Sequence, residues 1–350
     1  MKEDLLKENI LANNCSPISF EEALHENQLI VDVRSAAEYK GGSVPGAVNV
    51  PLFDEDERSV IGTIYKHGGQ GKAIAQGFSY VEEKLGKLLG AFEPYRKRTI
   101  AVFCARGGMR SRSIVNLLLQ SGYSAHQLVG GYKQYRHDIL AFLDNYAPKI
   151  IVLHGLTGTG KTRIIQALDA SIDLEELARH RSSLFGGLDR EPNCQKNFET
   201  LLVNTAKDLG PEPYFVEGES RKIGRVFIPK PFAMAMKSGV LVKITCSLEK
   251  RIERIVEDYP VEGAKKRGEI IKILLSLKQN MGAARVEQMC DLFNSNQLHE
   301  LVRILLVDYY DKRYARSMSE YTFDLEVSSE SISDAAEKLT AFRLTRIFHQ

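Results

Sequence analysis

The sequence predicts an α/β protein with two parallel-sheet domains, and three observations carry this prediction. The chain has 350 residues, which is long for a single hydrophobic core. Short apolar runs alternate with helical patterns along the chain, as in parallel sheets covered by helices. Two of the apolar runs, 100–103 and 149–153, lead directly into glycine-containing loops that are followed by helices. In such folds the loops at the carboxyl ends of strands hold the functional sites.

The composition is that of an ordinary globular protein, with 43% hydrophobic and 26% charged residues. The formal net charge of +2 is too small to attract a nucleic acid by itself, so any such contact needs local basic patches. The 5 cysteines are widely spaced and form no C-x-x-C pair, which argues against a disulfide framework or a structural zinc site. Residues 1–14 contain no apolar leader, and no apolar run is long enough to cross a membrane. We therefore expect a cytoplasmic protein with no membrane partner.

The first domain is predicted to span residues 1–147. An apolar run at 29–33 predicts a buried strand, and Asp32 and Arg34 lie at its end. A segment rich in glycine and proline follows. We therefore expect this pair to hold the loop formed by that segment rather than to form a surface ion pair, which would add little to stability. The other elements predicted in this domain are strands at 100–103 and 123–129 and a helical insertion near 53–92.

Cys104 comes directly after the predicted strand 100–103 and is the candidate nucleophile. The eight positions after it contain two glycines and three arginines, a composition that burial alone does not require. A cysteine that faces a ring of N–H groups and a helix N-terminus is favoured as a thiolate, and the arginines indicate an anionic substrate. The alternative is an inert buried cysteine beside a solvated charged face. The residues predicted to form the anion loop are Arg106, Gly107, Gly108, Arg110 and Ser111.

A second loop, at 155–162, matches the phosphate-binding pattern G-x-x-x-x-G-K-[ST] in its usual context of strand, loop and helix. Its backbone N–H groups and the helix N-terminus would hold phosphates, and Lys161 would reach the terminal ones. Thr162 is the candidate ligand for a magnesium ion, and the phosphate need not belong to ATP. The predicted phosphate-binding residues are Gly155, Thr157, Gly158, Gly160, Lys161 and Thr162.

The second domain, predicted at 148–350, contains a further strand that ends in acidic residues. Glu217 and Glu219 both occupy the place of a metal-binding carboxylate, although a surface network explains either one equally well. Arg251 and Arg254 lie on one side of a predicted helix, either on a solvated face or as part of a grip on an RNA backbone. Later predicted elements are an amphipathic helix at 265–281, a strand at 321–327 and a helix at 334–346 capped by Ser333.

Three segments of the first domain resemble the rhodanese family, a sulfurtransferase fold in which a loop cysteine carries a persulfide. They are DVRSAAEYKGGSVPGAVNVP, FCARGG and LVGGY. One departure is that five residues separate Cys104 from Arg110, one more than is usual in rhodaneses that carry sulfur. This C-x5-R spacing is similar to the loop of cysteine phosphatases, whose larger ring of N–H groups encloses a tetrahedral anion.

The fusion of a rhodanese-like parallel-sheet domain to a P-loop NTPase-like α/β domain resembles the tRNA 2-selenouridine synthase family. The likeness also includes ERSVIGTIYK, SLFGG, EGESRKIG and VFIP. It implies that the wobble 2-thiouridine of tRNA is first geranylated from geranyl diphosphate, and that selenium from selenophosphate then replaces the sulfur. Cys104 would be the nucleophile and could pass selenium onward as a selenosulfide. The P-loop would bind the diphosphate, magnesium could join it, and no resident metal or tightly bound cofactor is expected.

Three other functions stay open at this point. One is a sulfurtransferase that makes thiouridine, one is a cysteine phosphatase coupled to a kinase domain, and one is a phosphate-sensing or RNA-binding module without catalysis. The longer loop and the lack of an adenylating motif count against the first, and the lack of an evident general acid counts against the second. The sequence does not distinguish geranyl diphosphate from a nucleotide at the P-loop. It also indicates neither the tRNAs used nor the oligomeric state.

Overall fold

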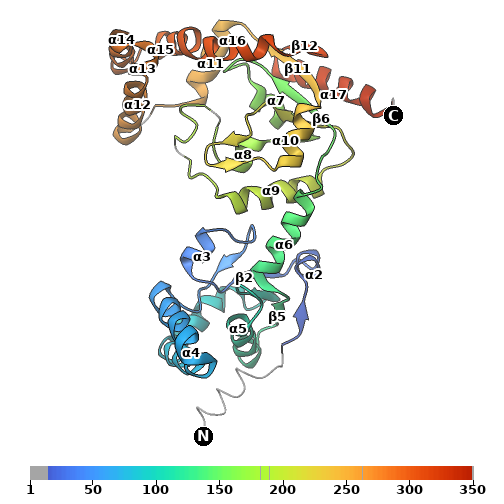
Figure 1. Ribbon diagram of the computed structural model, residues 1–350, viewed down its shortest axis with the longest axis vertical. Helices are drawn as coiled ribbons and strands as arrows, with labels where there is room; N and C mark the ends of the chain where they lie inside the picture. The colour runs from blue at the N-terminus through green and yellow to red at the C-terminus, as the bar shows by residue number, and fades with distance from the viewer. Residues whose placement is uncertain (1–14, 182, 189, 262, 349–350) are drawn as a thin grey trace. The chain divides into compact units, whose positions relative to one another are not determined.

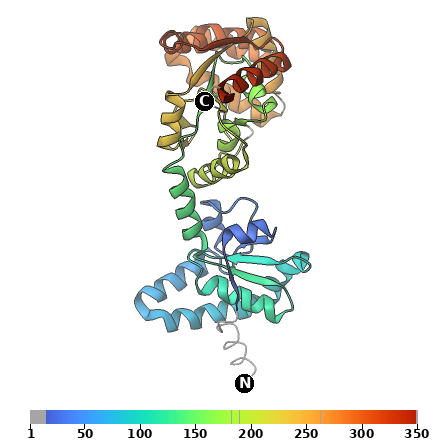
Figure 2. The ribbon, with the colours of Figure 1, turned by 90° about the vertical axis from the view of Figure 1, so that its right-hand side faces the viewer.

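The computed structural model describes residues 15–348 except 182, 189 and 262, so the segment 1–14, for which the sequence predicts no apolar leader, lies outside the described residues. The chain divides into two compact units, Met1–Phe142 and Leu143–Gln350, close to the predicted boundary after residue 147. Parallel sheets with helices around them form both units, which confirms the predicted α/β class (Figures 1 and 2).

A five-stranded sheet in the order β1-β5-β4-β2-β3 forms the centre of the first unit, and every neighbouring pair is parallel. All residues of β4 (Ile100–Phe103) and β2 (Leu29–Asp32) are buried, as their continuous apolar runs predict. Cys104 therefore leaves the middle of the sheet at its carboxyl edge. The remaining strands are β5 (Ala125–Leu128), β1 (Pro17–Ile18) and β3 (Val48–Asn49).

A capping box in the sequence explains where the longest helix of the first unit begins. Asp54 and Glu57 form a capping box at the start of α4 (Glu55–Phe92), which is the predicted insertion. This helix is two helices joined at Gly69, whose φ of 81° is the left-handed conformation that glycine adopts without strain. The other helices are α2 (Phe20–His25), α3 (Ala36–Lys40), the short η1 (Glu93–Tyr95), α5 (Met109–Gln120) and α6 (Gly131–Leu143).

The second unit also has a five-stranded parallel sheet, in the order β12-β11-β6-β8-β7. The strand before the phosphate-binding loop, β6 (Ile150–His154), lies in its centre between β11 (Val240–Thr245) and β8 (Tyr214–Glu217). The carboxyl ends of β6 and β8 therefore meet at one edge of the sheet. The other strands are β7 (Ser171–Ile172), β12 (Leu325–Ser328) and the antiparallel pair β9 (Lys222–Ile223) and β10 (Val226–Phe227).

A group of helices on one side of the second unit contains its own apolar core (Figure 1). The sequence predicts only one helix in this region, at 265–281. Leu274, Met289 and Phe293 are among its most deeply buried side chains. The elements of this group are α12 (Ala264–Ser276), α13 (Lys278–Met281), α14 (Ala283–Asn294), α15 (Leu298–Ile304), the π-helical η2 (Leu305–Tyr310) and α16 (Asp311–Ser319). The unit's other helices are α7 (Lys161–Ala167), α8 (Leu174–Ala178), α9 (Gln195–Asp208), α10 (Lys230–Lys237), α11 (Leu248–Asp258) and α17 (Ile332–Phe348).

Three sequence predictions in this unit need correction. The helix predicted at 265–281 is divided into α12 and α13. The late strand begins at Leu325 rather than at 321, since pairing with β11 starts there. The closing helix begins at Ile332, and Ser331 rather than Ser333 caps it, because the Ser331 hydroxyl accepts the Asp334 N–H at 3.3 Å.

Two predictions about composition can also be compared with the structure. The 5 cysteines are all free, which agrees with the predicted absence of a disulfide framework. None of the helices in the described part of the chain is long and apolar enough to cross a membrane.

Candidate functional site

The cysteine loop holds Cys104 in a fixed position at the end of β4. Its side chain is only 3% exposed. The Gly108 N–H donates to the Cys104 Sγ at 3.3 Å, and the Ser111 hydroxyl lies 3.3 Å from the same sulfur. The structure thus places Gly108 and Ser111, two residues of the predicted anion loop, in contact with the sulfur.

Gly131 allows the start of α6 to pack directly against this loop. A Cβ atom at Gly131 would lie 2.3 Å from the Gly107 nitrogen and 2.4 Å from the Cys104 carbonyl oxygen, so only glycine fits. Both Gly107 and Gly131 have positive φ, at 60° and 57°. The Tyr132 N–H then donates to the Cys104 carbonyl at 2.9 Å. The LVGGY segment therefore supports the backbone at Cys104.

Gln127 of β5 is a second support that the sequence analysis missed. Its side-chain amide donates to the carbonyls of Gly107 at 2.8 Å and Gly108 at 3.1 Å, and to the Ser111 hydroxyl at 3.0 Å. Gln127 is 7% exposed, and a buried polar side chain is stable only when such partners exist. A lone glutamine inside a predicted buried strand was the available signal.

The arginines of the loop differ in their surroundings. Arg106 is exposed, whereas Arg110 forms an ion pair with Glu38 of α3 at 2.9 Å. Arg58 of α4 contacts the same carboxylate at 2.9 Å. Burial alone would raise the pKa of Glu38, but hydrogen bonding and attraction from Arg110, with smaller contributions from Ser35 and Arg58, lower it to about 2. An anion entering the loop would therefore compete with Glu38 for Arg110.

The pair of Asp32 and Arg34 is buried and holds the following loop, as predicted. The Arg34 guanidinium donates to Asp32 at 2.6 Å and to the Gly42 carbonyl at 2.8 Å. The Ser43 hydroxyl also donates to Asp32, at 2.7 Å. The Arg34 guanidinium lies 3.9 Å from the ring centroid of Tyr132, which follows Gly131. This pair thus connects the β2 loop to the segment that supports Cys104.

The phosphate-binding loop of the second unit runs from Gly155 to the start of α7. Gly158 and Gly160 have φ of 83° and 81°, and each closely approaches α11. The Lys161 ammonium donates to the Gly155 carbonyl at 2.9 Å and lies 3.4 Å from that of Leu156. Lys161 therefore folds back over the loop, where the carbonyl groups of Gly155 and Leu156 accept its hydrogen bonds.

Arg251 and Arg254 of α11 are neither solvated nor free to contact RNA, which corrects both sequence interpretations. They are 4% and 3% exposed. Arg251 donates to the Thr157 carbonyl at 2.8 Å and pairs with Asp311 at 2.6 Å. Arg254 donates to the Thr159 carbonyl at 3.0 Å. The two arginines brace the backbone of the phosphate-binding loop.

Three carboxylates come together beside this loop. Ligand atoms of Glu175, Glu217 and Glu219 all lie within 4.8 Å of one another, and Thr162 and Lys161 line the same pocket. Burial, followed by the charge of Glu175, raises the pKa of Glu217, against the opposing effects of Lys161 and Thr162. Its Oε1 atom is buried without a hydrogen-bond partner among the described residues. The structure thus brings both predicted acidic residues together and adds Glu175, which no motif in the sequence indicates.

Comparison with known proteins finds matches to both units. Residues 148–342 match the model of the tRNA 2-selenouridine synthase AAA domain, and residues 16–138 match that of the rhodanese-like domain. A tRNA 2-selenouridine synthase from Chromohalobacter salexigens is 32% identical, covering 87% of this chain and 91% of the relative. One from Nitrosomonas europaea is 35% identical over 66% of this chain and 63% of its own length. Another, from Pseudomonas syringae, is 32% identical over 82% and 87%.

Proposed function

The chain belongs to the tRNA 2-selenouridine synthase family, and from that premise we propose that it replaces the sulfur of 2-thiouridine in tRNA with selenium. The observation that carries the proposal is the presence, on one chain, of a supported cysteine in a C-x5-R loop and a complete phosphate-binding loop with adjacent carboxylates. The enzyme is thus a transferase that acts on tRNA. Its proposed target is the wobble uridine, and its proposed location is the cytoplasm.

In this proposal the cysteine loop serves the selenium step. Selenophosphate is a tetrahedral anion, and the loop offers it the Gly108 N–H, the Ser111 hydroxyl and the nearby Arg110. Glu38 holds Arg110 until the anion arrives, and Arg58 remains beside Glu38 as a second cation. Cys104 is the proposed nucleophile because its sulfur lies beside the Gly108 N–H and the Ser111 hydroxyl. Its attack on phosphorus would form an S–P bond as the P–Se bond breaks and selenide leaves, with no change of oxidation state.

The phosphate-binding loop serves the proposed prenyl step. The N–H groups of the loop and Lys161 would hold the diphosphate of geranyl diphosphate and stabilise the charge that develops as it leaves. No tightly bound cofactor is proposed. Magnesium would fit this group of carboxylates. Glu217 has a buried oxygen with no hydrogen-bond partner among the described residues, Thr162 lines the same pocket, and Glu175 and Glu219 are adjacent. When bound, magnesium would add positive charge next to the diphosphate.

Mass spectrometry of nucleosides tests this proposal directly. The purified chain is incubated with tRNA containing 2-thiouridine, geranyl diphosphate and selenophosphate, and each small molecule is omitted in turn. The proposal predicts a geranylated nucleoside without selenophosphate and 2-selenouridine when both donors are present. An unchanged nucleoside under every combination would contradict it and would direct attention to sulfur transfer and phosphatase activity at Cys104.

A further inference from the structure

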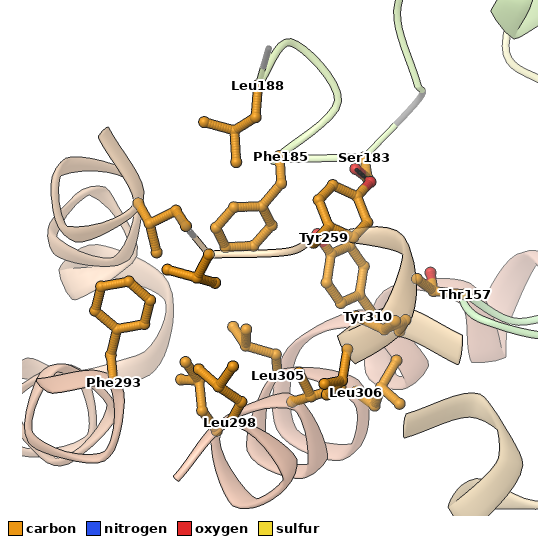
Figure 3. A pocket seen from close by; sticks show the side chains of 16 residues that line it. Thr157, Ser183, Phe185, Leu188, Tyr259, Phe293, Leu298, Leu305, Leu306 and Tyr310 are labelled. Atoms are coloured by element: carbon orange, nitrogen blue, oxygen red, sulfur yellow. Dashed lines mark hydrogen bonds between the residues drawn. The ribbon is translucent and has the colours of Figure 1, made fainter. Parts of the chain in front are cut away.

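A second pocket of the second unit is almost entirely apolar. It lies between the segment 183–188 and the helices α11, α12, α14, α15 and η2, and its empty space of about 680 Å³ includes open solvent at its mouth. Figure 3 shows Phe185 and Leu188 on one side of this space and Phe293, Leu298 and Leu305 on the other. We call it the apolar pocket.

The apolar pocket adjoins the phosphate pocket. Thr157, Ser183, Ile255 and Tyr259 line both spaces, and Thr157 belongs to the phosphate-binding loop itself. A ligand whose phosphates lie on this loop can therefore extend its remainder past Thr157 into apolar surroundings without leaving the unit.

Polar groups mark the boundary between the two pockets. The hydroxyls of Ser183 and Tyr259 lie 3.0 Å apart, and so satisfy each other's hydrogen bonding. The Arg181 guanidinium, which lines the phosphate pocket, lies 4.7 Å from the ring centroid of Tyr259. The ring of Tyr259 contacts Phe185 edge-on, with 6.3 Å between the centroids. Charge thus lies on one side of Tyr259 and aromatic carbon on the other.

We propose that the apolar pocket binds the hydrocarbon chain of a prenyl diphosphate whose diphosphate occupies the phosphate-binding loop. This inference rests on the proposed function and extends it by assigning the chain-binding residues. A nucleotide fits less well, because its ribose and base need hydrogen-bond partners that an apolar lining does not supply. The segment SLFGG, which covers the pocket with Phe185, is thereby part of the substrate site.

The pocket would discriminate between ligands by the length of their hydrocarbon chain. Each methylene group moved from water into an apolar site increases affinity about fourfold. Geranyl diphosphate should therefore bind at least about tenfold more tightly than dimethylallyl diphosphate, and both should bind more tightly than inorganic pyrophosphate.

Calorimetric binding of these three ligands to the full chain, with magnesium present, tests the inference. Val256 is a half-buried lining residue on α11, so Val256→Phe would fill part of the pocket. It should weaken geranyl diphosphate binding about sixteenfold, the effect of removing about two methylene groups from the pocket, and leave pyrophosphate binding unchanged. Val307→Phe is the matched control, because Val307 belongs to the same helical group but is 42% exposed and outside the lining.

A second variant keeps the inference testable if Val256→Phe does not fold. Leu298→Ala enlarges the pocket, and should shift the preference from geranyl toward the longer farnesyl diphosphate. If pyrophosphate binds but chain length and both variants have no effect, the apolar pocket is not the chain site and the proposed function survives. If neither pyrophosphate nor any prenyl diphosphate binds, the diphosphate role of the loop and this inference both fail.

Discussion

The close packing of Gly131 against the cysteine loop can be tested with Gly131→Ala. The added methyl group would lie 2.3 Å from the Gly107 nitrogen and 2.4 Å from the Cys104 carbonyl, both of which are backbone atoms that cannot rotate away. The left-handed backbone costs an alanine about 1–2 kcal/mol, and forcing extra volume into packed atoms costs about 1–3 kcal/mol more. We therefore expect the loop to lose about 2–5 kcal/mol of local stability.

Gly122→Ala is the matched control for this prediction. Gly122 lies in the same unit with φ of 78°, but a Cβ atom there would meet nothing within 4 Å. It should show only the backbone cost of about 1–2 kcal/mol. Hydrogen exchange of the full chain, followed by mass spectrometry of peptides within 100–135, measures the local difference. The two variants differ by the overpacking cost of about 1–3 kcal/mol, so at tenfold per 1.4 kcal/mol Gly131→Ala should expose the loop about 5- to 140-fold more often than Gly122→Ala.

The same variants should differ in the selenium step. Because Gly131→Ala displaces the Cys104 backbone, conversion of geranylated tRNA to 2-selenouridine should fall, while Gly122→Ala should retain it. Equal exchange and equal selenation in the two variants would refute the view that Gly131 supports the nucleophile through close contact.

Two further predictions concern buried charges. Asp32→Asn leaves the Arg34 guanidinium buried without its counter-charge and should lower the free energy of unfolding, measured in urea, by about 3–5 kcal/mol. The control Asp138→Asn, at a side chain that is 61% exposed, should lower it by less than about 1 kcal/mol. Equal losses in the two variants would contradict the structural role of the Asp32–Arg34 pair. Burial raises the pKa of Glu217 above its ordinary 4.5. The stability contributed by its protonated form is therefore complete below pH 4.5 and is lost as the pH rises through the higher pKa of the folded state. Glu217→Gln should make the thermal midpoint decline less steeply with rising pH. An identical pH profile in both proteins would show that Glu217 is not the buried group that titrates.

The two loops were predictable from the sequence because each is a local motif. A strand, a glycine-containing turn and a helix are contiguous in the chain, so the positions of Cys104 and Lys161 follow from short segments. The sheets were also predictable in outline, since continuous apolar runs such as β4 are buried on both faces.

The groups that support these loops were mostly not predictable, because they lie far away in the sequence. Glu38 and Arg110 are separated by 72 positions, and Arg251 and Asp311 by 60. These pairs depend on which helix covers which strand end, and a charge in a sequence does not show whether it will be buried. For the same reason Arg251 was interpreted as part of a solvated or RNA-binding face.

The apolar pocket could not be predicted for a different reason. Helices α14 and α15 have the apolar periodicity of any core helix, as Val286, Met289 and Phe293 illustrate. Whether such side chains close completely or leave a space depends on their volumes after packing. Only the arrangement of five helical segments around 183–188 distinguishes a lining residue from a core residue.

The central claim is that Cys104 serves the selenium step and Lys161 the prenyl step. The most direct test incubates the Cys104→Ala and Lys161→Ala variants with either thiolated or previously geranylated tRNA and both donors, and identifies the nucleosides by mass spectrometry. The account predicts that Cys104→Ala geranylates tRNA but forms no 2-selenouridine, and that Lys161→Ala selenates geranylated tRNA but fails to geranylate it. Selenation at the normal rate by Cys104→Ala, or normal geranylation by Lys161→Ala, would contradict it.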